Sequence, residues 1–239
     1  MIDLHCHLLP GVDDGPRTLD ESMALARMAV DNGIRHMKAT PHFLAITRKS
    51  TWDRIHAIVD EVRAELAARA IPLEISLAAE VRICGELVSL IPAGQVPFIG
   101  QWDGRPVLLL EFPHTSQLPF GSDKLIRWLI AQGITPMIAH PERNKTFQRE
   151  PEALESLRRA GCLLQVTSGA FIGQFGPEAE RVALALLDAG HITIVATDAH
   201  DSTERPPNLR AGFEVMARAA GEATAVRLTA ETPAAILGA

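Results

Sequence analysis

Met1-Ile2-Asp3-Leu4-His5-Cys6-His7 opens the chain as a short, largely apolar run that ends in His-x-His. Side chains alternate between the two faces of a β-strand, so a strand here places His5 and His7 on one face and Leu4 and Cys6 on the other. Two imidazoles about 7 Å apart, the spacing of alternate strand residues, can bind one metal ion. The stretch alone also fits two surface histidines, but the same pattern recurs along the chain and favours a metal site.

The sequence alternates between strand-like and helix-like segments with a nearly constant repeat. After the first strand we expect strands over 34–40, 73–79, 107–110, 135–139, 162–166 and 191–197, and helices over 18–32, 51–70, 86–90, 122–132, 151–160, 177–189 and 208–220. A polar residue follows nearly every strand, at His7, His42, Glu80, Glu111, His140, Thr167 and Asp198, with intervals of 27 to 38 residues. Seven such units indicate an α/β protein with a parallel sheet, in a closed or nearly closed, TIM-like (β/α) barrel.

Length and composition fit one domain over residues 1–239, because no linker or low-complexity segment interrupts the pattern. The net charge of −6 and the isoelectric point near 5.8 argue against a nucleic-acid partner that binds a basic face. The three cysteines are widely spaced, as expected for reduced thiols in a cytoplasmic protein. We expect no membrane insertion, because the sequence has neither a signal-peptide pattern nor an apolar run of about 18 residues.

The carboxyl ends of parallel strands meet at one face of a barrel, so the polar residues at the strand ends should converge. Nine side chains there are metal-ligand types: His5, His7, His42, Glu80, Glu111, His140, Asp198 and His200, with either Asp13 or Asp14 from the first loop. A single zinc-type site needs only three or four ligands, so nine predict two or three metal ions. Imidazoles and carboxylates without thiolates suit manganese, iron or zinc.

Two arginines should lie on the same face, Arg143 in the loop after the fifth strand and Arg205 in the loop after the seventh. Two guanidinium groups beside metal ions suit a phosphate dianion, because each can bind it bidentately. Ordinary surface arginines are the alternative. His36, His56 and His191 are expected to be structural or solvated, whereas His114 could belong to the site or to a loop.

Other hydrolytic chemistries lack their sequence signals. A cysteine-dependent phosphatase needs an arginine six residues after the thiol, and here Val12, Leu90 and Ser168 occupy those positions. Neither a GxxxxGK[ST] motif nor a GxGxxG motif after a strand is present, so nucleotide-loop chemistry is unsupported. The expected nucleophile is therefore a metal-bound hydroxide.

The motifs, taken together, resemble one known family. Residues 2–15, IDLHCHLLPGVDDG, are similar to the opening of the PHP (polymerase and histidinol phosphatase) superfamily. The version is that of the bacterial manganese-dependent protein-tyrosine phosphatases encoded with capsule or exopolysaccharide genes. The stretches ATPH (39–42), AEVR (79–82), LEFP (110–113), AHPER (139–143), QVTSGA (165–170), TDAH (197–200) and RPPN (205–208) fit in the same order.

The resemblance implies a distorted seven-stranded barrel that holds three metal ions and acts on phosphotyrosine, on a bacterial tyrosine kinase that regulates polysaccharide synthesis. Its ligands would be His5, His7, Asp14, His42, Glu80, Glu111, His140, Asp198 and His200. Arg143 and Arg205 would hold the phosphoryl group. The sequence departs from the family in two places. Phe43 stands where many members have a second histidine, so any role of that side chain is lost. The loop from Leu44 to Ser50 is unlike the family, which bears on substrate preference more than on catalysis.

Three other functions fit part of the pattern. A metal-dependent amidohydrolase also begins with His-x-His, but it usually has a lysine where Glu111 stands, and paired arginines favour phosphate over amide. A small-molecule phosphatase such as histidinol-phosphate phosphatase shares the superfamily and its ligand set. A non-catalytic, metal-stabilised module that binds the kinase would lack some ligands, and none is missing here.

Overall fold

The computed structural model describes residues 1–43, 49–114 and 117–238. Its first half contains β1 (Ile2–Cys6), α1 (Leu19–Asp31), β2 (His36–Ala39), α2 (Lys49–Ala68), β3 (Glu74–Leu77), β4 (Val81–Arg82), α3 (Leu87–Leu90), β5 (Gly100–Trp102) and β6 (Arg105–Glu111). The second half contains α4 (Ser122–Ala131), β7 (Thr135–Ala139), η2 (Pro141–Arg143), α5 (Lys145–Arg149), α6 (Pro151–Arg159), β8 (Leu163–Thr167), η3 (Ser168–Ile172), α7 (Pro177–Asp188) and β9 (Ile194–Ala196). The chain closes with α8 (Leu209–Ala220), α9 (Glu222–Val226), η4 (Arg227–Glu231) and α10 (Thr232–Leu237).

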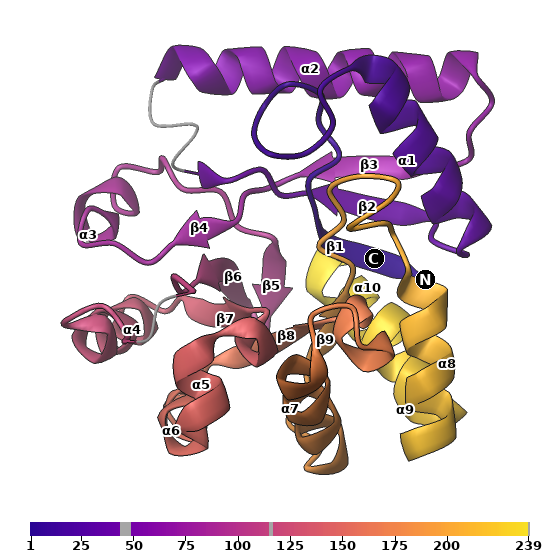
Figure 1. Cartoon of the computed structure of the whole chain (residues 1–239). Helices are drawn as coiled ribbons and strands as arrows, with labels where there is room; N and C mark the ends of the chain where they lie inside the picture. The colour runs from indigo at the N-terminus through magenta and orange to yellow at the C-terminus, as the bar shows by residue number, and fades with distance from the viewer. Residues whose placement is uncertain (44–48, 115–116, 239) are drawn as a thin grey trace.

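The described strands form two parallel sheets, in the orders β1-β2-β3 and β4-β6-β7-β8-β9, with β5 antiparallel to β6. Helices lie outside the strands, α1 and α2 over the first sheet and α4 to α7 around the second (Figure 1). Helix α8 packs in a cluster with residues from both sheets. The α/β class with parallel strands is confirmed. Isolated bridges, Cys6 with Ala199 and His42 with Glu80, link the two sheets. The described ladders stop at these links, so a continuous seven-stranded barrel remains a prediction.

The first strand departs from the simple alternation expected for it. Its register against β2 shifts between Asp3 and Cys6, so this strand carries one extra residue, a β-bulge. Leu4 consequently packs in the cluster that contains Leu109, whereas Cys6 packs in a different cluster that contains Met37. The prediction that Leu4 and Cys6 share one face is therefore wrong, because the bulge changes the phase of the strand.

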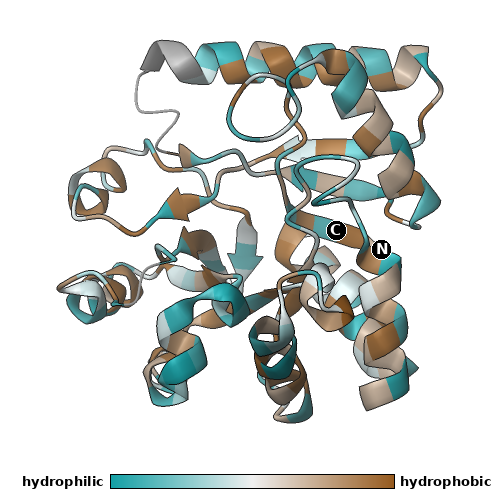
Figure 2. Ribbon diagram, in the orientation of Figure 1, coloured by the Kyte–Doolittle hydropathy of each residue, from teal (hydrophilic) through white to brown (hydrophobic). Residues whose placement is uncertain are grey.

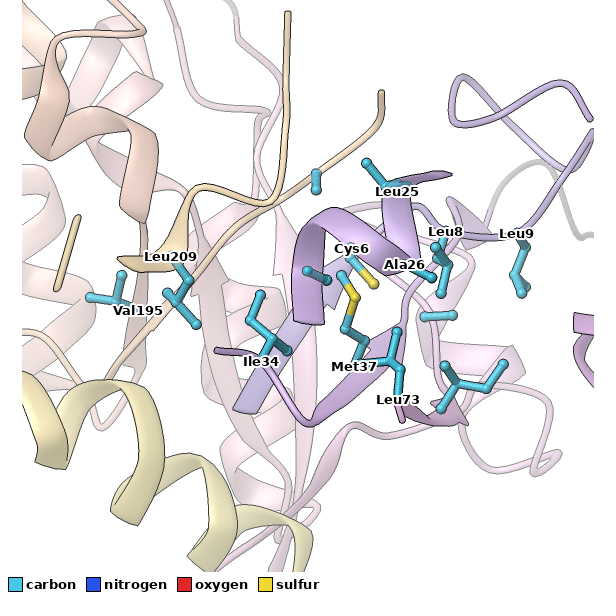
Figure 3. Close-up of a cluster of buried hydrophobic side chains, with 14 of the residues drawn as sticks. Cys6, Leu8, Leu9, Leu25, Ala26, Ile34, Met37, Leu73, Val195 and Leu209 are labelled. Atoms are coloured by element: carbon cyan, nitrogen blue, oxygen red, sulfur yellow. The ribbon is translucent and has the colours of Figure 1, made fainter. Parts of the chain in front are cut away.

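The core consists of buried clusters between the strands and the surrounding helices. The helices mix hydrophobic and hydrophilic residues along their length, as Figure 2 shows, and α1 turns Met23, Leu25, Ala26 and Ala29 inward. These α1 residues belong to the cluster that contains Cys6, Ile34 and Met37, part of which is drawn in Figure 3. The predicted helix over 18–32 is present as α1, and its N-terminus is closed by a capping box, in which Thr18 and Glu21 exchange both capping hydrogen bonds. No helix in the described part of the chain is long and apolar enough to cross a membrane.

Candidate metal centre

All nine predicted ligands lie close together at the carboxyl ends of the strands. With His114, they fall into groups of three or four whose ligand atoms lie within 4.8 Å of one another: His7, Asp14, His42 and His200; His5, His7 and Glu80; His5, His140 and Asp198; Glu111, His114 and His140; His42, Glu80 and Glu111. These groups share members, as expected where carboxylates and imidazoles surround more than one ion. The convergence expected from the strand spacing is therefore present in the structure.

Three histidines are oriented by a hydrogen-bond partner at Nδ1. His5 Nδ1 lies 2.8 Å from Gln165 Oε1, His7 Nδ1 lies 2.7 Å from Asp13 Oδ2, and His200 Nδ1 lies 2.9 Å from the Asp198 carbonyl. Each partner is a hydrogen-bond acceptor, so each Nδ1 must carry the proton. Nε2 is therefore the nitrogen left to bind a metal ion, the arrangement usual for histidine ligands.

The same Nε2 atoms supply a test of whether a metal fits. Within the described ranges, the Nε2 atoms of His5, His7 and His200 and the Oδ1 atom of Asp198 are buried and make no hydrogen bond. Asp198 Oδ1 lies 3.2 Å from His5 Nε2 and 3.4 Å from His7 Nε2. Buried polar atoms without partners are costly, and several of them aimed at one another fit a shared divalent cation. The donor set contains no sulfur, which suits manganese, iron or zinc.

The two buried carboxylates at the centre are held as anions. Burial alone would raise the pKa of Glu80. When His5 is protonated at Nε2 as well as Nδ1, in place of binding a metal ion, its charge and hydrogen bonds from His140 and His42 lower that pKa well below its usual value. The pKa of Asp198 is likewise lowered against the effect of burial, first by the charge of His5. Ionised carboxylates are the form that binds cations, so both are ready ligands.

The first loop separates the roles of Asp13 and Asp14. Asp13 is occupied on both oxygens, because Oδ2 accepts from His7 Nδ1 and the backbone N–H of His42 and Oδ1 accepts from the N–H of Gly15. Asp14 instead directs Oδ1 towards Nε2 of His200 at 3.2 Å and of His42 at 3.4 Å. The loop folds tightly onto the first strand: a Cβ at Gly15 would lie only 2.2 Å from the His7 carbonyl oxygen.

Both predicted arginines reach this cluster. Arg143 Nη1 and Arg205 Nη2 donate to the same atom, Asp198 Oδ2. The Arg143 guanidinium also lies 4.4 Å from the centroid of the Phe175 ring, a cation–π contact. The pair therefore places two cationic forks at one edge of the candidate centre.

The mouth of the centre is a cavity of about 290 Å³ lined by His42, Phe43, Glu80, Arg82 and Glu111. Phe43 is buried and its ring lies 6.3 Å from that of Trp52, so it contributes an apolar wall where a second histidine would be polar. Most of the divergent loop, residues 44–48, lies outside the described residues.

The remaining histidines divide as follows. His36 is bound to Ser76 Oγ at 2.7 Å, and His191 lies 3.8 Å from Glu155 beside a separate cavity. His56 lies on α2 and contacts only Trp52 among the described aromatic contacts. His114 is exposed, stacks on His140 with ring centroids 5.1 Å apart and is part of one candidate ligand group, so it lies beside the candidate centre.

Sequence reasoning missed three buried residues that support the centre. Asp3 accepts hydrogen bonds from Thr197 N at 3.0 Å and from its hydroxyl, which ties β1 to the segment that carries Asp198. Glu142 precedes Arg143 and accepts a hydrogen bond from Thr167 N at 3.0 Å. Burial raises the pKa of Asp3 to about 6 and that of Glu142 to about 7. Gln165 contacts His5. A charged or amide residue in a buried strand or turn is the signal that could have identified them.

Comparison with known proteins identifies relatives of this chain. The family model for capsular polysaccharide synthesis, CpsB/CapC, matches residues 1–238. The tyrosine-protein phosphatase YwqE of Bacillus subtilis (strain 168) is 33% identical over 229 residues, which cover 96% of this chain and 89% of YwqE. The tyrosine-protein phosphatase CpsB of Streptococcus agalactiae serotype III (strain NEM316) is 28% identical over 242 residues, which cover 99% of this chain and 98% of CpsB.

Solved structures give the same relationship. A chain from the crystal structures of YwqE from Bacillus subtilis and CpsB from Streptococcus pneumoniae, described as unique metal-dependent tyrosine phosphatases, aligns with a TM-score of 0.90. It is 32% identical, and the match covers 100% of this chain and 94% of that chain. The lactonase Lmo2620 from Listeria monocytogenes, at 15% identity and a TM-score of 0.56, shares the fold alone. The chain belongs to the CpsB/CapC family of capsular polysaccharide synthesis.

Proposed function

We propose that this protein is a metal-dependent phosphatase that hydrolyses phosphotyrosine on a protein substrate. The observation that carries the proposal is the position of Asp198, whose Oδ1 faces unpaired histidine nitrogens while its Oδ2 holds both arginines. A metal-ligand cluster thus adjoins a double guanidinium site. That combination suits a phosphate monoester better than an amide or a lactone. The similarity to YwqE and CpsB supports phosphotyrosine as the substrate.

The proposed ligands are His5, His7, Asp14, His42, Glu80, Glu111, His140, Asp198 and His200, with two or three ions, manganese first among them. Bound there, the ions would supply Lewis-acid polarisation of the phosphoryl group and activation of a water molecule. Arg143 and Arg205 would turn donors other than those held by Asp198 to the phosphoryl oxygens and stabilise the charge that develops on them. Asp13 would hold His7 and the backbone of His42 in place.

The proposed physiological substrate is a bacterial tyrosine kinase that regulates polysaccharide synthesis, acted on in the cytoplasm. The family match to capsular polysaccharide synthesis supports the process. Three unpaired cysteines, two of them buried, are consistent with a reducing compartment.

A substrate panel tests the proposal. The metal-free protein is assayed on a phosphotyrosine peptide, the matching phosphoserine peptide and histidinol phosphate, each with and without manganese. We expect turnover only with metal and the highest kcat/KM on phosphotyrosine, because a phenolate of pKa about 10 leaves more easily than an alkoxide. A clear preference for histidinol phosphate would replace this proposal with a small-molecule phosphatase, and a preference for phosphoserine would refute the tyrosine assignment.

A further inference from the structure

We propose that Gln165 is a positioning residue of the metal centre, which sets the orientation of two ligands from different strands at once. It lies in β8 and is fully buried. Its Oε1 atom lies 2.8 Å from Nδ1 of His5, from β1, and 3.3 Å from the backbone nitrogen of His140, at the end of β7. The inference rests on the proposed metal-dependent function, since it concerns ligands of that centre.

The bond to His5 selects which nitrogen faces the centre. An amide oxygen can only accept, so Nδ1 of His5 donates and Nε2 is directed towards Asp198 and Glu80. Those carboxylate oxygens already lie 3.2 Å and 3.5 Å from Nε2. A neutral acceptor therefore fixes the ring without adding a third negative charge around a buried imidazole, in contrast to His7, whose outer partner is the carboxylate of Asp13.

The bond to His140 acts on the backbone. His140 has a φ of +33°, in the left-handed region that non-glycine residues rarely adopt. Its N–H is buried and finds its acceptor in Gln165 Oε1. Since this backbone turn directs the imidazole towards Glu80, at 2.7 Å, loss of the acceptor would release the ligand as well as the turn.

The other end of the same amide argues against a role in packing alone. Gln165 Nε2 is buried and has no hydrogen-bond partner among the residues that the structure describes. An unpaired buried amide is unfavourable for stability, and an apolar side chain in its place would avoid that cost. The favourable contribution of Gln165 therefore comes from its oxygen, which positions the two proposed ligands His5 and His140.

The test measures manganese binding to metal-free protein by isothermal titration calorimetry, with thermal unfolding recorded alongside. Q165L removes the acceptor, and we expect manganese binding that is 10- to 100-fold weaker, the usual effect of losing a residue that orients a metal ligand. Q165E keeps an acceptor oxygen at the same reach but adds the negative charge that glutamine avoids, so its affinity should lie between those of Q165L and the wild type. The control is L164A, on the same strand, whose buried side chain belongs to the hydrophobic cluster that contains Leu110, Ile138 and Phe147. It should lower the unfolding temperature without changing the affinity.

Manganese affinity of the wild-type strength in folded Q165L would overturn the inference, as would equal losses in Q165L and L164A, which would mean that only the stability of β8 matters. Should Q165L not fold, Gln165→Met, which is closer to glutamine in length, replaces it with the same expectation. A wild-type protein that binds no metal would instead refute the proposed function, so the two failures are distinguishable.

Discussion

Arg143 and Arg205 both donate to Oδ2 of Asp198, and the other oxygen of that carboxylate faces His5 and His7. One buried side chain therefore joins the guanidinium pair to the histidine cluster. An anion bound by both arginines would lie directly beside the candidate metal centre. This proximity is what a phosphoryl group requires if cationic side chains and metal ions are to act on it together.

Replacing either arginine by alanine should lower kcat/KM by some 10²–10³-fold, the usual scale for the loss of one transition-state electrostatic contact. The measurement is steady-state kinetics on a phosphotyrosine peptide at saturating manganese. Arg→Lys variants should recover only part of the loss, because an ammonium group cannot bind bidentately.

Metal content distinguishes phosphoryl binding by the two arginines from a structural role. Both arginines contact Asp198, so their replacement also removes contacts of a proposed ligand. We expect the metal content of R143A and R205A, measured by elemental analysis, to stay at the wild-type value. Parallel loss of metal and activity in both variants would show that the arginines support Asp198 and do not bind substrate.

Asp13 and Asp14 should differ when each is changed to asparagine. D14N removes the anionic oxygen that faces His42 and His200, so we expect fewer manganese ions bound per chain. D13N keeps an acceptor near Nδ1 of His7, so we expect full stoichiometry with affinity weakened by about 10-fold or more. Calorimetric titration of both variants gives the two quantities, and the opposite pattern would make Asp13 the ligand.

Much of this centre could be predicted from the sequence because its residues lie where strands end. Each proposed ligand other than His5 and Asp14 ends a strand or follows one within four residues, and His5 is the last but one residue of β1. Parallel strands bring such positions to one edge whatever the details of packing. The choice between Asp13 and Asp14 could not be made, because two neighbouring carboxylates in a loop are equivalent until the loop is folded. Gln165 was also missed, since a strand residue reveals its partners only when strands from both sides are in place.

The details of the sheets were less predictable for the same reason. The bulge in β1 depends on its pairing with β2, which the alternation of one strand does not encode. The hairpin strand β5 is short and rich in polar and glycine residues, and it exists only through its antiparallel pairing with β6. By contrast, the predicted helix over 18–32 agrees closely with α1, because the capping bonds between Thr18 and Glu21 depend only on neighbouring residues.

The cysteines should be dispensable for chemistry. Burial raises the pKa of Cys162 to about 12, so almost none of this thiol is ionised at pH 8. We expect native Cys162 to resist iodoacetamide at that pH, measured by mass spectrometry, and to react after unfolding. A variant with Cys84 and Cys162 changed to alanine should retain kcat within about threefold, and a loss near 10⁴-fold in the folded variant would identify a nucleophile.

Manganese should stabilise the fold as well as permit turnover. The centre brings together buried nitrogen and oxygen atoms of His5, His7, His200 and Asp198 that make no hydrogen bond in the described structure, and a bound cation would satisfy them. Ligand at 100 times its dissociation constant stabilises the native state by about 2.7 kcal/mol. For a chain of this size, about 2–4 °C per kcal/mol converts this to a rise in unfolding temperature of about 5–11 °C. Differential scanning fluorimetry of metal-free protein, with and without manganese, measures the shift.

The matched control is Asp198→Asn, which keeps the size of the side chain but removes the charge that faces both the histidines and the arginines. In this variant the manganese-dependent shift should shrink to a small fraction of that in the wild type, at equal metal concentration. Chelation of the wild-type protein should abolish phosphatase activity, and added manganese should restore it along with the shift. Full activity in protein shown to be metal-free by elemental analysis would contradict the metal-dependent assignment, whatever the thermal shift.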